Sequence, residues 1–309
     1  MKKPDRQGSH KPPHPARVLI IGVSGFLGRH LAAHLAGNGM RVFGTSRNAE
    51  TAGTLDGVEK IFSWDGRNAD RLAALLSDVN AVINLAGEPL RTTPWSPWYR
   101  SRLRDSRIRP AAALAAAATV SRHLRVIQGS AVGFYGDTGD HWVDENSSPG
   151  NGFLSSLVTD WELAATTGKS KHVSLAVART GVVMGADGGA GRRLEKFRTL
   201  GVIPLPGGGR QWVAWIDMSD YLKAVRFLLS HPELTGTFNL AAPNPVRFSD
   251  LVSEPDPGKR PVLRIFIPRP LVRITLGTAA ETILLGQRVK PERLLEAGFR
   301  FSRPEWRAG

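Results

Sequence analysis

The feature that most constrains this chain is a run of spaced glycines directly after a short apolar segment. Gly22, Gly25 and Gly28 form the pattern G-x-x-G-x-x-G, which follows the apolar residues 17–21 and opens an amphipathic stretch at 26–35. A strand, a tight turn and a helix in that order predict the first unit of a parallel α/β sheet. The first glycine permits the turn, the second lets a phosphate approach the backbone, and the third allows close helix packing.

The same alternation continues along the chain. Further strands are predicted at 41–44, 61–63, 81–85, 124–128, 173–179 and 237–240, and helices at 70–76, 98–119, 153–166, 220–229, around 271–285 and at 292–297. Apolar strands that alternate with helices indicate a parallel sheet covered on both faces. We therefore predict an α/β fold with a doubly wound, Rossmann-type parallel sheet.

Composition along the chain predicts three parts. Residues 1–15 are basic and proline-rich, so we expect a disordered tail. Residues 16–180 form a Rossmann domain that carries the glycine turn, and residues 218–240 return to it. Residues 181–217 and 241–309 form a smaller C-terminal α/β domain that binds substrate, because glycine-rich and proline-rich loops interrupt the alternation there.

Residue counts exclude several classes of protein. The 309 residues contain no cysteine, which excludes disulfides, thiolate-bound zinc, iron–sulfur clusters and a cysteine nucleophile. No apolar run reaches the roughly 18 residues of a membrane helix. No apolar segment follows the basic start of the chain as in a secretory signal. We expect a cytoplasmic protein that does not contact a membrane.

The chain is basic, with a net charge of +14, and the charge is concentrated in segments. Residues 91–125 hold eight Arg against one Asp, and residues 258–309 hold eleven Lys and Arg against four Glu. No nucleic-acid motif accompanies them, so we expect a solvated surface and arginines that bind the phosphates of a small ligand. A nucleic-acid partner is not expected, and a monomer and a homodimer both remain open.

The end of the second strand predicts which dinucleotide binds. NAD-binding sheets place an acid there to hold the ribose hydroxyls, whereas this chain reads Thr45-Ser46-Arg47. The planar guanidinium of Arg47 can pair with a 2′-phosphate, so we predict NADP (NADPH) with Ser46 and Arg47 as ligands. The alternative is a solvent-exposed Arg47, with Glu50 reaching back to the ribose.

Other positions around the glycine turn complete the predicted cofactor site. The free N–H groups at the start of the first helix attract phosphates, and Ser24, Phe26 and Leu27 belong to this turn. Asp65 follows the third strand and either binds the adenine amino group or caps a turn. The small residues after the fourth strand let the backbone lie against the cofactor ribose; they are Leu85, Ala86 and Gly87.

Several longer blocks follow in order: NLAGEP at 84–89, SAVGFYG at 130–136, GFLSSLVTDWE at 152–162, RTGVVMG at 179–185, GRQWVAWI at 209–216 and QRV at 287–289. Together they resemble the extended short-chain dehydrogenase/reductase superfamily. The match is closer to its atypical branch of NAD-dependent epimerase/dehydratase-like proteins, which carries a short C-terminal domain. The resemblance implies a nicotinamide cofactor and places Arg179 with the cofactor ligands and Glu88 with the substrate ligands. One departure is local, since residues 252–260 replace an expected helix.

The catalytic pair of that superfamily is missing. Its Tyr and Lys are spaced Y-x-x-x-K, but Tyr99, Tyr135 and Tyr221 are followed four residues later by Leu, Gly and Val. Alignment with the family puts Leu154 and Val158 at the Tyr and Lys positions, and neither can transfer a proton.

Two residues remain as candidates for the catalytic site. Ser130 ends the fifth strand and either hydrogen-bonds a substrate oxygen or caps the backbone. Tyr135 lies in a loop near the predicted site and either replaces the missing acid or serves only in packing.

Three polar residues are candidates for holding a phosphate or carboxylate of the substrate. Arg107 follows the fourth strand on a helix, and Arg210 and Gln211 follow a glycine triplet. The alternatives are a surface arginine at 107 and an ion pair of Arg210 with Asp217 or Asp220. No metal site is expected, because the histidine pair at 30 and 34 lacks further ligands.

The sequence thus leads to two hypotheses from different classes. The first is an NADP(H)-dependent oxidoreductase or epimerase of the extended short-chain dehydrogenase type that acts on an unidentified small molecule, phosphorylated or acidic. The second is a protein that keeps the cofactor without the chemistry and acts as an NADPH-binding sensor or scaffold.

Overall fold

The computed structural model describes residues 16–119, 123–167, 170–185, 188–253 and 263–307. The tail predicted at 1–15 and most of the departure at 252–260 lie outside these residues. Among the described helices, none is both long and apolar enough to span a bilayer.

A seven-stranded sheet forms the centre of the protein, with the order β12-β7-β5-β4-β1-β2-β3 and every pairing parallel. The strand order reverses between β1 and β4, so the sheet is doubly wound. The predicted fold class is confirmed. The seven strands are β1 (Arg17–Ile21), β2 (Arg41–Ser46), β3 (Val58–Ser63), β4 (Ala81–Asn84), β5 (Leu124–Ala131), β7 (Val173–Thr180) and β12 (Gly236–Leu240).

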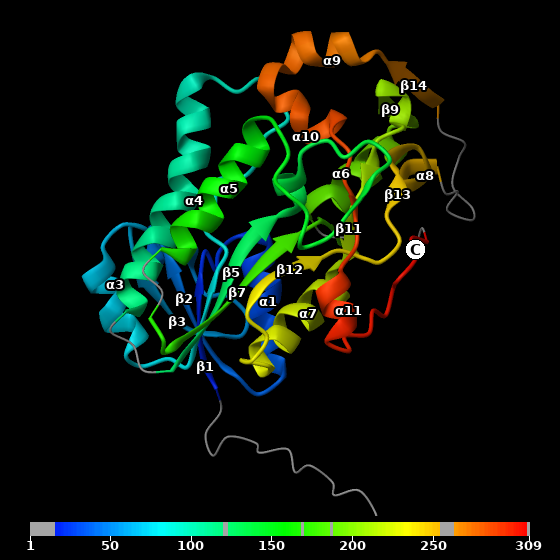
Figure 1. Cartoon of the computed structure of the whole chain (residues 1–309). Coiled ribbons are helices and arrows are strands. Elements are labelled where there is room, and N and C mark those ends of the chain that lie inside the picture. The colour runs from blue at the N-terminus through cyan, green and yellow to red at the C-terminus, as the bar shows by residue number, and fades with distance from the viewer. Residues whose placement is uncertain (1–15, 120–122, 168–169, 186–187, 254–262, 308–309) are drawn as a thin grey trace, which may run out of the picture.

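Helices cover both faces of the sheet (Figure 1). One face carries α1 and α7 with the short α11, and the other carries α3, α4 and α5. The short α2 lies between β2 and β3 in the chain. These helices are α1 (Phe26–Gly37), α2 (Ala49–Ala52), α3 (Ala69–Leu76), α4 (Pro97–Ala118), α5 (Phe153–Thr166), α7 (Met218–Ser230) and α11 (Glu292–Glu296).

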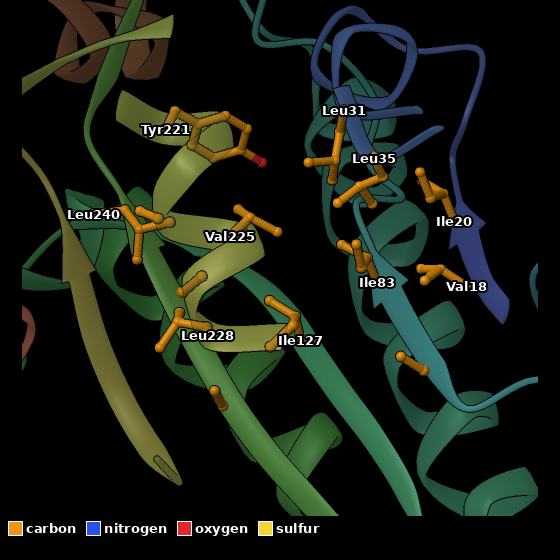
Figure 2. Packing of buried hydrophobic residues seen from close by; sticks show 14 of the residues in the cluster. Val18, Ile20, Leu31, Leu35, Ile83, Ile127, Tyr221, Val225, Leu228 and Leu240 are labelled. Carbon is orange, nitrogen blue, oxygen red and sulfur yellow. The ribbon is translucent and has the colours of Figure 1, made fainter. Parts of the chain in front are cut away.

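Helical spacing of apolar side chains explains how α1 and α7 pack on the sheet. Leu31 and Leu35 of α1 are fully buried beside Ile20 and Ile83, and α7 contributes Leu228 to the same cluster (Figure 2). Because successive residues of a strand face opposite sides, Leu19 and Ile21 belong to the second cluster, beneath α3 and α4. The core therefore fixes the strand ends where the site lies.

The remaining elements form the smaller part of the molecule, at the carboxyl edge of the sheet (Figure 1). Four two-stranded pairs (β8–β11, β9–β14, β6–β15 and the antiparallel β10–β13) connect short helices. The elements are β6 (Trp142–Val143), β8 (Val182–Gly185), α6 (Gly189–Thr199), β9 (Val202–Pro206), β10 (Trp212–Val213), β11 (Trp215–Asp217), β13 (Val246–Arg247), α8 (Phe248–Ser253), β14 (Leu263–Ile267), α9 (Arg269–Leu276), α10 (Glu281–Leu284) and β15 (Arg288–Val289). Short 3₁₀ turns lie at Val132–Tyr135, Gly207–Gly209 and Gly277–Ala280.

The helical stretch predicted around 271–285 is divided in two. Helix α9 ends at Leu276, and Gly277 adopts a positive φ of 55° before a 3₁₀ turn leads into α10. Such a left-handed residue ends a helix, because it turns the chain away from the helix axis. The apolar periodicity predicted the helices but not the break.

Candidate functional site

The glycine turn brings the loops after β1 and β4 into contact. Gly22 has a φ of 84°, and a Cβ there would lie 3.1 Å from the Leu85 carbonyl carbon and oxygen. A Cβ on Gly28 would lie 2.4 Å from the Gly22 oxygen, so α1 packs directly on the turn. The spacing therefore produces the tight turn and the close helix packing that the sequence predicts.

A cleft of about 490 Å³ opens at this point, where the strand order reverses. It runs along the carboxyl ends of β1, β2 and β4, the usual place for a ligand in an open α/β sheet. Ten of the predicted site residues line it: Gly22, Ser24, Gly25, Ser46, Arg47, Asp65, Leu85, Ala86, Gly87 and Glu88.

The other predicted residues of the glycine turn support it from behind. Gly28 contacts the turn itself. Leu27 packs against the sheet core, and Phe26 packs on the backbone of Gly188 and Gly189. None of the three lines the cleft. Their side chains therefore support the turn, and contact of their backbone N–H groups with a cofactor stays a prediction.

Asp65 lines the cleft and also organises its own loop. Its Oδ1 accepts hydrogen bonds from the backbone N–H groups of Arg67 (2.9 Å) and Asn68 (3.1 Å). These bonds lower the pKa of the Asp65 carboxyl, because they stabilise the charged form. The turn-capping interpretation is therefore realised, and the side chain still faces the cleft.

The loop after β4 is ordered by buried polar groups. Asn84 Oδ1 accepts the Ala86 backbone N–H at 3.1 Å, and its Nδ2 donates to Gln128 Oε1 at 3.0 Å. The Glu88 carboxylate is buried and accepts a 2.8 Å bond from Arg102 Nη2. Its backbone N–H donates to Ser106 at 2.9 Å. The loop is therefore held in place on the cleft side of α4.

Arg107 of α4 also holds the loop that follows β4. Its Nη2 donates to the Glu88 carbonyl at 3.0 Å and its Nη1 to the Leu103 carbonyl at 3.1 Å, and the guanidinium packs over Trp161. Burial lowers the pKa of this guanidinium to about 10, so it stays charged at neutral pH. Two of its donors face protein carbonyls, so the geometry favours a structural role for Arg107, and its binding of a substrate anion stays a prediction.

Ser130 belongs to a buried polar network rather than to the cleft lining. Its hydroxyl donates to Glu162 Oε1 at 2.5 Å. Arg179 donates to both oxygens of Glu162 at 2.8 Å from its Nε and Nη2. The Arg179 and Glu162 side chains are only 6% and 13% exposed. Arg179 therefore pairs with Glu162 and is not part of the cleft lining, and its predicted place among the cofactor ligands stays a prediction.

Tyr135 closes the same network. Its hydroxyl accepts from Arg179 Nη1 at 3.0 Å and donates to Asn239 Oδ1 at 2.8 Å. Burial raises the pKa of Tyr135 to about 12, although Arg179 opposes the shift. A buried phenol with both roles already used is a poor proton donor, so the geometry favours the packing interpretation.

The positions aligned with the missing catalytic pair are apolar inside the fold as well. Leu154 packs with aromatic residues of α4 and α5, and Val158 packs with Val132 and Phe134. Both are buried. Proton transfer from these two positions is therefore impossible.

Arg210 and Gln211 lie in the smaller part of the molecule, away from the residues that line the cleft. The buried Gln211 side chain donates to the Ile283 carbonyl at 2.9 Å. Arg210 is exposed, and the carboxylates of the alternative have other partners: Asp217 pairs with Arg303, and Asp220 accepts backbone N–H groups. Within the described residues the predicted ion pair of Arg210 is therefore not formed, and the substrate role of Arg210 and Gln211 stays a prediction.

Much of the cleft wall was not predicted from the sequence. Helix α4 contributes polar residues to the wall, and the loop between β3 and α3 contributes a glycine and an arginine. The sequence predicted α4 as a long basic helix but did not indicate which of its faces would line the cleft. The missed lining residues include Thr45, Gly66, Arg67, Pro89, Arg102, Asp105, Ser106 and Arg109.

Comparison with known families agrees with this geometry. A family model described as the NAD dependent epimerase/dehydratase family matches residues 18–241. The chain belongs to this family. A second model, described as a domain of unknown function (DUF1731), matches residues 267–308. The resemblance to an atypical extended short-chain dehydrogenase with a short C-terminal domain is confirmed.

Members of the epimerase/dehydratase family that are similar to the chain span almost its whole length. An epimerase family protein of Mycobacterium bovis is 36% identical over 294 residues, which cover 93% of each chain. The mouse epimerase family protein SDR39U1 is 34% identical over 302 residues and covers 94% of this chain and 97% of its own. The crystal structure of human SDR39U1 with NADPH superposes with a TM-score of 0.79 at 29% identity, covering 94% of this chain and 96% of that one.

Proposed function

We propose that this chain binds NADPH in the cleft and is an NADP(H)-dependent oxidoreductase or epimerase of the extended short-chain dehydrogenase type. The observation that carries the proposal is the glycine turn at the switch point, with Arg47 at the rim of the cleft. The similar human protein whose structure contains NADPH supports it.

The residues present fit a dinucleotide. Helix α1 begins after Gly25 with no side chain capping its first N–H groups and no acidic residue in its first turn. These N–H groups are therefore available to a pyrophosphate, and the helix dipole favours its negative charge. At the rim, the Arg47 guanidinium has no hydrogen-bond or ion-pair partner within the described residues, so its charge is available to a phosphate.

Bound NADPH would supply a hydride to a carbonyl carbon, and bound NADP+ would accept one from a carbinol carbon. On the protein side, Ser130 does not line the cleft, and its hydroxyl donates to Glu162. A substrate that extends beyond the cleft to Ser130 would therefore meet a hydrogen-bond acceptor there. Glu162 acts as a positioning residue here, and Arg179 holds it on two atoms. The arrangement suits a substrate that carries a hydroxyl on the reacting carbon.

A second candidate function is a non-catalytic NADPH-binding sensor or scaffold. It is favoured by the apolar residues at 154 and 158 and by the fully engaged Tyr135 hydroxyl. Under this alternative the cleft still binds NADPH, but the chain lacks the groups that would transfer a proton to or from a substrate.

Calorimetry with NADPH and NADH tests the cofactor assignment. We expect tighter binding of NADPH, and Arg47→Gln is expected to weaken NADPH about tenfold or more with little effect on NADH, since a charged hydrogen bond contributes about 1.5–3 kcal/mol. Preference for NADH would contradict the assignment. Turnover of NADPH with a library of carbonyl compounds then supports the enzyme, and tight binding without turnover supports the sensor.

A further inference from the structure

A side pocket opens from the cleft at the carboxyl ends of β2 and β3. It measures about 190 Å³ and shares Arg47, Trp64 and Asp65 with the main cleft. Its remaining walls come from Ser63 and from Asn68 and Arg71 at the start of α3. The pocket therefore extends the predicted cofactor site past the ends of β2 and β3 to the start of α3.

The backbones of the two arginines in this pocket are held by the pocket's other residues. Ser63 Oγ donates to the Arg47 carbonyl at 3.3 Å, which joins the ends of β3 and β2. Asn68 Oδ1 accepts the Arg71 backbone N–H at 2.8 Å and caps α3. The two side chains thus extend from fixed points on different elements toward one cavity.

The charges of this pocket are not balanced. Within the described part of the chain, neither the Arg47 nor the Arg71 guanidinium has a hydrogen-bond or ion-pair partner. The acid that lines the pocket is Asp65, whose Oδ1 is already bonded to two backbone N–H groups. Two free guanidinium groups against one engaged carboxylate leave net positive charge where the cleft meets the side pocket.

We propose that Arg71, together with Arg47, forms a two-arginine seat for the 2′-phosphate of NADPH and determines the preference over NADH. The inference rests on the proposed function and adds a residue from α3 that the strand-end pattern does not indicate. A 2′-phosphate carries nearly two negative charges, and paired planar guanidinium groups suit its oxygens. If Arg71 were instead only a solvent-exposed surface residue, it would not affect whether the protein binds NADPH or NADH more tightly.

The test compares NADPH with NADH, which differ only by this phosphate, in wild type and in Arg71→Gln. We expect Arg71→Gln to weaken NADPH about tenfold or more by calorimetry and to leave NADH unchanged. Arg71→Lys, which keeps the charge but loses the fork, should fall in between. Arg300→Gln is the control: Arg300 is exposed and lines neither the cleft nor the side pocket, so this variant should keep the wild-type ratio of NADPH to NADH affinity.

Adenosine 2′,5′-bisphosphate and adenosine 5′-monophosphate repeat the comparison without the nicotinamide, so the readout is independent of turnover. Arg71→Gln should weaken only the bisphosphate. In the Arg47→Gln/Arg71→Gln double variant the two losses should not add, because both arginines hold one group. If wild type binds neither dinucleotide, the proposed function fails and this inference with it. If wild type prefers NADPH but Arg71→Gln leaves the ratio unchanged, the Arg71 assignment alone is refuted.

Discussion

At the scale of single residues, the five-membered network around Glu162 explains why the site differs from a standard short-chain dehydrogenase. Ser130, Arg179 and Tyr135 bond to one another or to Glu162 inside the fold, and Asn239 completes the network. Buried polar groups of this kind are stable only when every donor and acceptor is used. The polar residues that the sequence offers for chemistry are thus largely engaged in holding β5, β7 and α5 together.

Replacing Tyr135 tests this interpretation. Tyr135→Phe leaves Asn239 Oδ1 without that donor and Arg179 Nη1 without that acceptor, so we expect a loss of about 1–3 kcal/mol in the free energy of unfolding. NADPH affinity should not change, because Tyr135 does not line the cleft. Urea unfolding and calorimetry provide the two measurements. A large loss of affinity at unchanged stability would mean that Tyr135 serves the ligand instead.

The alkaline pH dependence offers an independent check on the same side chain. Burial raises the Tyr135 pKa from 10 to about 12, so the unfolded chain ionises first as the pH rises. The stability that the neutral phenol contributes is complete below pH 10 and declines between pH 10 and 12. The stability difference between wild type and Tyr135→Phe should therefore shrink across that interval. A difference that is constant with pH would place Tyr135 in contact with solvent.

At the scale of elements, the contact between α1 and the glycine turn determines the shape of the cleft. Gly28 has no room for a side chain, whereas a Cβ on Gly37, at the other end of the same helix, would meet nothing within 4 Å. The two glycines therefore separate the effect of packing from the effect of helix propensity.

Gly28→Ala and Gly37→Ala form a matched pair. We expect Gly28→Ala to cost about 1–3 kcal/mol and to weaken NADPH, because the new methyl group pushes α1 away from the turn. Gly37→Ala should be neutral or stabilise by up to about 1 kcal/mol. Thermal unfolding and calorimetry measure both. Equal effects of the two substitutions would show that close packing at Gly28 is not required.

How far the sequence predicted these elements depends on the range of the interactions involved. The glycine turn and most strands were predictable because their signals lie within a few neighbouring residues. The partners of Arg107 and Arg179 were not, since Glu88 and Glu162 lie 19 and 17 residues away and meet them only after folding. The division of the 271–285 stretch at Gly277 was also missed, because an isolated glycine in a helical pattern does not reveal its φ.

At the scale of the whole molecule, the smaller part completes a helix of the Rossmann part. Helix α5 begins after Gly152 without a side-chain cap of its own. The cap comes instead from Glu281 of α10, which lies 128 residues after Phe153 in the chain. Its carboxylate accepts the Phe153 N–H at 3.0 Å and the Leu154 N–H at 2.9 Å. The negative charge of the carboxylate also interacts favourably with the positive end of the α5 dipole. Since α5 carries Leu154, Val158 and Glu162, the C-terminal part helps to position the helix beside Ser130.

Glu281→Gln tests this coupling between the two parts of the chain. A glutamine can accept with only one oxygen, so one N–H of α5 loses its partner, and we expect a loss of about 1–2 kcal/mol in the free energy of unfolding. Hydrogen exchange should quicken at Phe153 and Leu154. Glu296→Gln, an exposed glutamate at the end of α11, is the control and should change neither measurement. If both variants unfold alike and exchange at α5 is unaltered, the helix start is fixed by its own packing against α4 and not by the C-terminal part.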